Sequence, residues 1–173
     1  MKWIYVNSID NSSRYVLGTV GNKPLVCFGI NPSTAEPDNL DRTLESVDRL
    51  AKSNGFDSWI MLNVYPQRST DPNLLHRSLD KELHIRNLNE IESILKEYKP
   101  VIWASWGTLI EKRKYLYSCL KDIVELTKKY DCNWISIGKI SKYGHPHHPL
   151  YLKSTEQSKV FLIDDYLDKS QSL

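Results

Sequence analysis

The feature that most constrains the fold is a regular alternation of apolar runs and amphipathic segments from residue 25 onward. Four short apolar runs, rich in β-branched and aromatic residues, are typical of strands. They cover residues 25–30, 59–64, 101–104 and 133–138. Apolar residues at three- and four-residue spacing predict helices over residues 41–54, 81–98 and a third segment that ends near 129. This alternation predicts a parallel sheet with helices on both faces and right-handed crossovers.

Two further segments lie outside this alternation. Residues 3–6 and 14–17 are strand-like and flank a cluster of Ser, Asn and Asp, which predicts an N-terminal β-hairpin. Residues 155–167 are amphipathic and predict a last helix. We therefore expect a three-layer α/β/α fold with a central, mostly parallel four-stranded sheet plus the hairpin, in a single domain of residues 1–173.

Composition excludes few classes of function. The 173 residues are 40% hydrophobic and 25% charged, as in ordinary globular proteins. No apolar run approaches the length of a membrane span and no secretory leader is evident, so we expect a cytoplasmic monomer without a membrane partner. Three cysteines without metal-type spacing fit a reducing compartment. A net charge of +2 does not by itself predict nucleic-acid binding.

Polar or special residues follow the end of each predicted parallel strand. Pro32 fixes its own φ and restricts Asn31 to extended geometry, which aims the Asn31 amide. The four strand ends carry Asn31-Pro32-Ser33-Thr34, Asn63 with Tyr65, Trp106-Gly107, and a loop that contains His145 and His148. Because the carboxyl ends of parallel strands meet at one edge of a sheet, this edge is the predicted site. The alternative is a set of ordinary strand ends and capped loops.

Several chemistries lack their motifs. No Gly-rich phosphate loop follows a strand, so chemistry on nucleoside triphosphates or NAD is disfavoured and no cofactor is expected. The cluster of His145, His147 and His148 raises the possibility of a metal site. Pro146 and Pro149 make this loop rigid, however, and no carboxylate lies beside it in the sequence, so we expect no metal.

Amides, hydroxyls, imidazoles and aromatic rings suit recognition of a flat heterocycle. The Asn63 amide offers a donor and an acceptor to the edge of a base. Trp106, Tyr65 or Tyr143 could stack on the face of the base, which is worth roughly 1–3 kcal/mol. A histidine at the same edge could stabilise charge on a departing base. The alternative is that Asn63 caps a strand end and Trp106 belongs to the core.

These stretches resemble a bacterial and phage family of unknown function and, more distantly, the uracil-DNA glycosylase superfamily. The first resemblance covers nearly the whole chain and includes Asp41-Arg42-Thr43. The second rests on the end of the first strand, the Asn-ended strand, the Trp-Gly turn and the His-Pro loop over about residues 25–155. The residues concerned are Gly29-Ile30-Asn31-Pro32-Ser33, Met61-Leu62-Asn63, Ser105-Trp106-Gly107 and His145-Pro146-His147-His148-Pro149-Leu150.

The glycosylase resemblance implies a role for each matching position. Asn31 would position the water that attacks the sugar C1′, and Asn63 would recognise the base. Either His145 or His148 would face the carbonyl oxygen of the base, because the loop has two histidines where the superfamily has one serine. Leu150 would insert into the stack left by a flipped nucleotide.

The loop after the first strand adds further candidates. Ser33 stands where one branch of the superfamily has Tyr, which leaves room for a 5-substituted pyrimidine. Ser33 or Thr34 could cap the next turn or direct a hydroxyl at a ligand. Asp41 fits an ordinary helix N-cap with Arg42 exposed, or alternatively Arg42 or Thr43 borders the crevice.

Three hypotheses therefore stand. The first is a hydrolase of N-glycosidic bonds that acts on a base in a nucleic acid or nucleotide. The second is a module of the same fold that binds such a base without cleavage. The third is a metal-dependent hydrolase that uses the histidine cluster.

Overall fold

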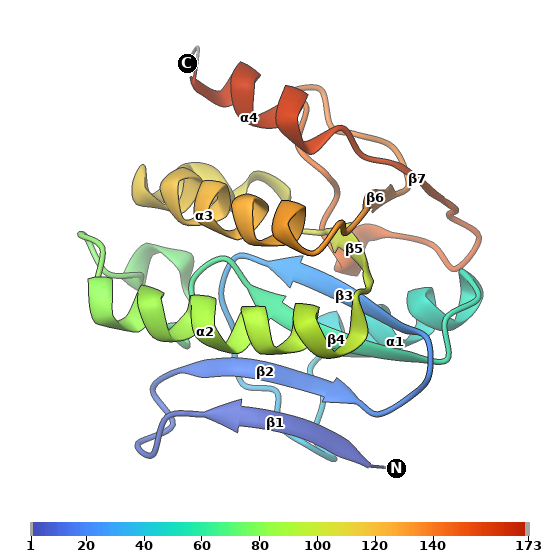
Figure 1. The fold of residues 1–173 in the computed structure, drawn as a ribbon, viewed down its shortest axis with the longest axis horizontal. Helices are drawn as coiled ribbons and strands as arrows, with labels where there is room; N and C mark the ends of the chain where they lie inside the picture. The colour runs from blue at the N-terminus through green and yellow to red at the C-terminus, as the bar shows by residue number, and fades with distance from the viewer. Residues whose placement is uncertain (1, 172–173) are drawn as a thin grey trace.

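A single mixed β-sheet of seven strands runs through the molecule in the computed structural model, which describes residues 2–171 (Figure 1). The strands are β1 (Trp3–Asn7), β2 (Arg14–Thr19), β3 (Pro24–Gly29), β4 (Ser58–Asn63), β5 (Val101–Ala104), β6 (Trp134–Ile137) and β7 (Ser158–Val160). Their order in the sheet is β1-β2-β4-β3-β5-β6-β7.

The four inner strands are parallel, and they are the four strands predicted from the apolar runs. β3 lies between β4 and β5, and β6 pairs with β5. The expectation of a four-stranded sheet was wrong, because antiparallel strands extend it at both edges. The hairpin β1–β2 joins through β2 and β4, and β7 pairs with β6.

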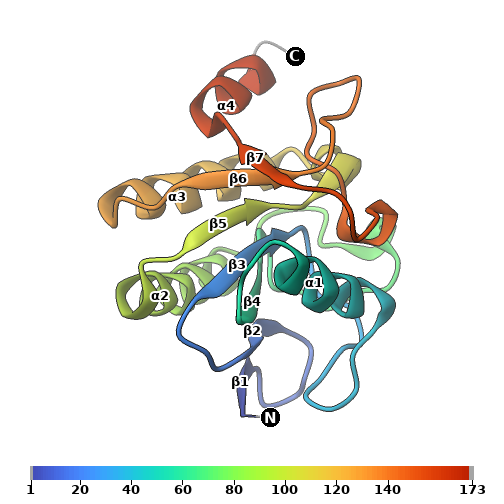
Figure 2. The ribbon, with the colours of Figure 1, turned by 90° about the vertical axis from the view of Figure 1, so that its right-hand side faces the viewer.

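Helices cover both faces of the sheet, as Figure 2 shows for α1 on one side and α2 and α3 on the other. The helices are α1 (Arg42–Ser53), α2 (Lys81–Tyr98), α3 (Tyr115–Lys129) and α4 (Ile163–Gln171). Three short 3₁₀ turns are η1 (Pro72–Leu74), η2 (Gly107–Lys112) and η3 (Pro149–Tyr151). The carboxylates of Asp41 and Asp80 cap α1 and α2, which explains why these two helices begin where the sequence predicted.

The last predicted helix is wrong in its first half. Residues 158–160 form the edge strand β7, and α4 begins only at Ile163. All three residues of β7 are exposed, so the strand has no buried face. A strand this short, without an alternating apolar pattern, gives no periodic signal in the sequence.

The core has two halves because side chains of a strand alternate between the faces of the sheet. Val26 and Phe28 of β3 pack toward α2, α3 and α4, whereas Leu25 and Cys27 pack toward α1. β3 and β4 are buried along their whole length. Continuous apolar runs are what a parallel strand covered on both faces requires.

The order of the inner strands creates a switch point. The chain leaves β3 through α1, on one face of the sheet, and leaves β5 through α3, on the other. Because β3 and β5 are neighbours, the two connections diverge and open a crevice beyond their carboxyl ends. In the part of the chain that the structure describes, no helix is long and apolar enough to span a membrane.

Candidate functional site

A cavity of about 390 Å³ lies at the switch point, and we call it the Asn31 cavity. The loop after β3, the first turn of α1 and a loop that contains Ser69 and Thr70 form its walls. His148, from the histidine loop after β6, closes one side. Its predicted site residues are Asn31, Pro32, Ser33, Arg42 and His148. The structure thus brings together candidates from the first and last strand ends.

The amide of Asn31 has a defined orientation. Its Nδ2 donates to the carbonyl oxygens of Ser69 at 2.9 Å, Pro32 at 3.0 Å and Gln67 at 3.5 Å. A group surrounded by three acceptors must be the NH₂ end of the amide. Oδ1 receives no hydrogen bond from the described residues, and the half-buried side chain borders the cavity. Asn31 therefore presents an acceptor of fixed direction.

His148 presents the complementary donor. Its Nδ1 accepts a hydrogen bond from the backbone N–H of Leu150 at 3.3 Å, which caps η3. Burial lowers the pKa of His148, and the nearby charge of Asp41 opposes this effect only in part. The ring is therefore neutral at pH 7 with its proton on Nε2, where it can donate to a ligand oxygen.

A second cavity of about 340 Å³ adjoins the first, and we call it the Trp106 cavity. Trp106, Gly107, His145 and His147 contribute to its walls, and His148 borders both cavities. Gly107 has φ +61°, a left-handed conformation that favours glycine, and a Cβ there would lie 3.4 Å from the Cβ of His148. The Trp-Gly turn thus permits close packing of the histidine loop.

His145 is held inside the protein through both ring nitrogens. Nε2 donates to Glu111 Oε1 at 2.7 Å, since a carboxylate accepts. Nδ1 is then the acceptor for the Tyr166 hydroxyl at 2.8 Å, which itself accepts from Trp106 Nε1 at 3.0 Å. This chain fixes the histidine loop to η2 and α4. Of the two candidate histidines, His148 is the one with a nitrogen left for a ligand.

Asn63 lies behind the wall of the Asn31 cavity. It is fully buried, and neither its Nδ2 nor its Oδ1 has a hydrogen-bond partner among the described residues. Its nearest cavity-lining neighbours are Gly29 and Met61, and a Cβ on Gly29 would lie 3.3 Å from Asn63 Oδ1. A buried amide without partners costs free energy, on the order of 1–3 kcal/mol for each unpaired group. Such groups are common where a ligand or water supplies the partner.

Two predicted stacking residues belong to the core instead. Tyr65 is fully buried, and its hydroxyl lies 2.6 Å from His76 Nδ1. Trp106 is also fully buried and packs edge-on against Trp134. Neither ring presents an exposed face to a base. Their apolar surface completes the helix-covered core, which is what aromatic residues beside a parallel strand most often do.

The remaining predicted contacts lie at the rim. Thr34 is exposed and borders a shallow hollow beside the Asn31 cavity. Leu150, in η3, is 43% exposed, and Tyr143 is 75% exposed. None of these three side chains lines the Asn31 cavity. Any role for them requires a ligand that extends beyond this cavity.

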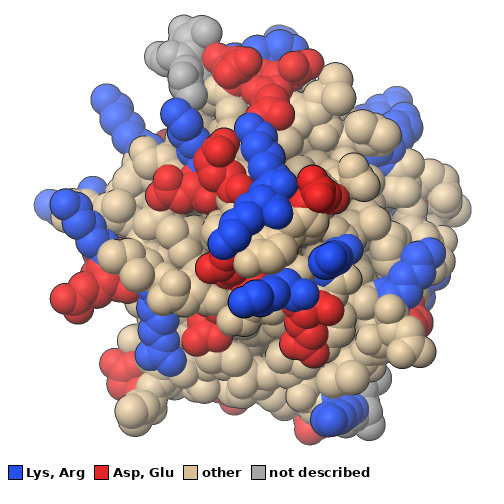
Figure 3. All heavy atoms as spheres, viewed as in Figure 1, with Lys and Arg blue, Asp and Glu red and all other residues tan. Residues whose placement is uncertain are grey.

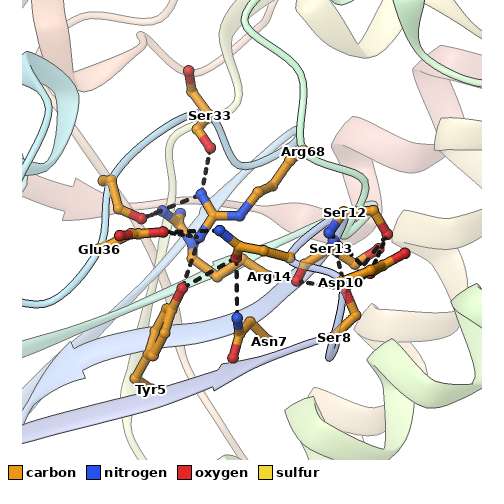
Figure 4. A network of polar contacts seen from close by, with 12 residues as sticks. Tyr5, Asn7, Ser8, Asp10, Ser12, Ser13, Arg14, Ser33, Glu36 and Arg68 are labelled. Carbon is orange, nitrogen blue, oxygen red and sulfur yellow. Dashed lines mark hydrogen bonds and ion pairs between the residues drawn. The ribbon is translucent and has the colours of Figure 1, made fainter.

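Sequence reasoning missed Arg14 and Arg68. Arg14, the first residue of β2, is 2% exposed and lines the Asn31 cavity. Arg68 lies beside it, and its guanidinium faces the backbone of Ser33 and the hydroxyl of Tyr5 (Figure 4). The signal in the sequence was an arginine at the start of a strand that is otherwise apolar, because a charge in such a strand is rarely buried without a function.

Two further observations bear on the kind of ligand. No group of three His, Cys, Asp or Glu side chains among the described residues is arranged to hold a metal ion. On the face covered by α2 and α3, basic and acidic side chains are interspersed (Figure 3). That face therefore lacks the continuous basic stripe with which proteins bind a nucleic-acid backbone.

Comparison with known proteins gives one match. Residues 14–150 match the sequence model of a family described as "Protein of unknown function (DUF1643)". The match begins at Arg14 and includes every residue that lines the Asn31 cavity. No curated protein and no solved structure matches the chain. The distant similarity to uracil-DNA glycosylases therefore stays a hypothesis.

Proposed function

Because the chain belongs to the DUF1643 family, whose function is unknown, we propose a function from the Asn31 cavity itself: hydrolysis of an N-glycosidic bond in a nucleotide or nucleic acid. One observation carries this proposal. Asn31, whose amide orientation is fixed by hydrogen bonds, and His148, whose imidazole is neutral, both line one cavity at the switch point of a parallel sheet. The resemblance to the glycosylases, which rests on the same residues, agrees with this proposal.

In this proposal Asn31 positions the attacking water. Its Oδ1 accepts a hydrogen bond from the water, while the carbonyls of Pro32 and Ser69 hold the amide in place. An amide is too weak a base to remove a proton early in the reaction. The barrier must therefore fall through stabilisation of the cationic sugar and of the departing base.

His148 acts on the departing base. Its Nε2–H donates to a carbonyl oxygen of the base as negative charge develops there. A neutral donor suits this role, and the lowered pKa of His148 keeps the ring neutral at pH 7. The hydrogen bond from Leu150 N to Nδ1 holds the tautomer that places the proton on Nε2.

Asn63 recognises the base. Its amide has one donor side and one acceptor side without partners, which matches the edge of a pyrimidine such as uracil. Met61 lines the cavity, and its Cε and Asn63 Oδ1 both lie close to the position that a Cβ on Gly29 would take, so in this proposal a shift of the flexible Met61 side chain admits the base.

The direct test is base release, measured by mass spectrometry, from nucleotides and oligonucleotides that carry uracil, hypoxanthine or 5-modified pyrimidines. Single- and double-stranded forms are compared, each with and without a chelator. Release that persists with chelator and disappears in Asn31→Ala supports the proposal. Asn89→Ala, at an exposed position of α2, is the matched control.

The second candidate is a module that binds the same ligand without cleavage. The observation that favours it is that, among the described residues, the cavity lining offers no uncommitted carboxylate to act as a general base. Asp41 is the carboxylate that lines the Asn31 cavity, and its Oδ1 is engaged as the N-cap of α1 through Leu44 N at 2.9 Å. Measurable binding without base release, for every base tested, would select this candidate.

A further inference from the structure

Arg14 is a buried charge with little compensation. One hydrogen bond is formed by its guanidinium, from Nη1 to the carbonyl oxygen of Ala35 at 3.1 Å, and Nε has no partner among the described residues. No carboxylate of the described chain lies within ion-pair distance of it. A buried guanidinium is normally paired, because removal of a charge from water is costly.

Arg68 increases this local excess of positive charge. Its Nη1 also donates to the Ala35 carbonyl, at 3.3 Å, so two guanidinium groups share one acceptor. Figure 4 shows Arg14 and Arg68 beside each other. The nearest acid is Glu36, whose half-exposed carboxylate lies 3.9 Å from Arg68 Nη2. Burial, together with the charge of Arg68, lowers the pKa of Arg14 to about 10, and the charge of Asp41 opposes this effect only in part. The free protein thus holds two like charges close together.

Other residues that line the Asn31 cavity offer further donors. The lining contains the N-terminus of α1, where Arg42 and Thr43 are the first two residues and their backbone N–H groups have no helical partner. Arg42 is also an exposed residue of this cavity and brings a second positive charge to it. Ser69 and Thr70 line the cavity beside it. The Ser69 hydroxyl already donates to the Asp71 carbonyl oxygen at 2.6 Å, so Thr70 supplies the hydroxyl donor of this pair.

A helix N-terminus, a buried arginine and a hydroxyl are donors of the kind that bind phosphate. Asp41 lies at the same helix N-terminus, and its negative charge disfavours the binding of an anion there. One of its carboxylate oxygens, however, already accepts a hydrogen bond from Leu44 N. The cavity lining contains two arginines, Arg14 and Arg42, and one aspartate, Asp41, so its net charge is +1.

We propose that the Asn31 cavity binds a terminal phosphate group of its ligand, held by Arg14, Arg42 and the first turn of α1. The ligand is then a nucleotide, or a nucleic-acid strand that ends in a phosphate. This assignment of the ligand rests on the proposed function, since that proposal supplies the base and the sugar. The phosphate site itself rests only on the charges and donors of the cavity.

Size and charge favour one phosphate over an extended backbone. The cavity volume of about 390 Å³ lies in the range of small-molecule sites, roughly 300–1,000 Å³. Duplex-binding proteins neutralise several phosphates, with many exposed Lys and Arg side chains in a row. Arg14 is 2% exposed and lines the cavity, so only a group that enters the cavity can meet it.

The test is calorimetric titration of the full chain with inorganic phosphate, a nucleoside 5′-monophosphate and the matching nucleoside, at constant ionic strength. Two trinucleotides of one sequence, with a 5′-phosphate and a 5′-hydroxyl, distinguish a strand end from a free nucleotide. The variants are Arg14→Gln and Arg42→Gln. Arg77→Gln, at an exposed position away from the cavity, is the control.

We expect the monophosphate to bind at least tenfold more tightly than the nucleoside. Arg42→Gln should reduce that preference at least fivefold, and Arg14→Gln should remove it. If Arg14→Gln does not fold, the exposed Arg42 carries the test. Equal affinity for monophosphate and nucleoside, or equal effects of Arg42→Gln and Arg77→Gln, would overturn the proposal. A phosphate preference without any base release supports this site and contradicts only the glycosidase.

Discussion

Asn31 and His148 border the same cavity although they follow strands on different sides of the switch point, β3 and β6. One presents a fixed acceptor and the other a neutral donor. Neither group is unusual alone. Their joint placement is what distinguishes this edge of the sheet from a set of ordinary strand ends.

Asn31→Ala should lower stability as well as activity. The substitution removes the donor shared by the carbonyls of Ser69, Pro32 and Gln67 and leaves these acceptors without it. We expect a loss of about 1–3 kcal/mol in the free energy of unfolding. Urea denaturation of the variant and of Asn89→Ala measures it. A loss no larger than that of the control would mean that the amide does not hold this loop.

Asn63→Leu should separate stability from binding. Leucine has nearly the same shape as asparagine and needs no hydrogen bonds, so removal of an unpaired buried amide should be neutral or stabilising. Ligand affinity should fall at least tenfold if the amide recognises the base. Thermal melting and calorimetry give the two values. A strongly destabilised variant would show that Asn63 has a structural partner, such as a buried water.

His148 predicts a pH dependence. Burial lowers its pKa in the folded protein below the ordinary value of 6.5, so the unfolded chain binds more protons below that pH. The folded protein should therefore lose stability, relative to His148→Gln, as the pH falls through about 6.5 toward the lowered value. Urea denaturation of both proteins at pH 7.5 and 5.5 measures the difference. An unchanged difference would contradict the burial of this imidazole.

Tyr166→Phe should loosen the histidine loop. The hydroxyl connects Trp106 Nε1 and His145 Nδ1, and its removal leaves both of these buried groups unpaired. We expect a loss of about 1–3 kcal/mol. Tyr143→Phe, at a side chain that is 75% exposed, is the control and should change little. Equal effects of the two variants would show that the buried chain of hydrogen bonds contributes nothing.

Gly107→Ala should weaken binding in a way that Gly55→Ala does not. Both glycines have positive φ, at +61° and +79°, so alanine at either position costs roughly 1–2 kcal/mol of stability. At Gly107 the new Cβ would lie 3.4 Å from the Cβ of His148, an ordinary van der Waals contact, so a backbone shift that relieves the positive φ would move His148, whereas nothing lies within 4 Å of a Cβ at Gly55. Ligand affinity should therefore fall in Gly107→Ala alone. Equal affinities would mean that the position of His148 does not matter for binding.

The inner part of the fold could be predicted because its signals are local. Continuous apolar runs identified β3 and β4, and the cap at Asp41 identified the start of α1. The edge strand β7 could not be found, because it is short, exposed and held only by pairing with β6. Pairing between distant segments leaves no trace in local periodicity.

The site was predicted in part for the same reason. Asn31 and His148 follow strand ends, and the topology of a parallel sheet brings such ends together. Tyr65 and Trp106 occupy similar positions in the sequence, yet both are buried in the core, because the direction of a side chain depends on packing that the sequence does not display. Arg14 was not predicted because it joins the cavity through contact with the loop after β3, a segment that is not adjacent to it in the sequence.

The most direct test of the account is the rate of base release under single-turnover conditions, measured for the wild type, Asn31→Ala and Asn89→Ala on the best substrate of the panel. We expect release by the wild type and by Asn89→Ala at similar rates, and a loss of at least a hundredfold in folded Asn31→Ala. Release that is unchanged in Asn31→Ala, or absent from the wild type with every base tested, would contradict the assignment of hydrolysis to this cavity.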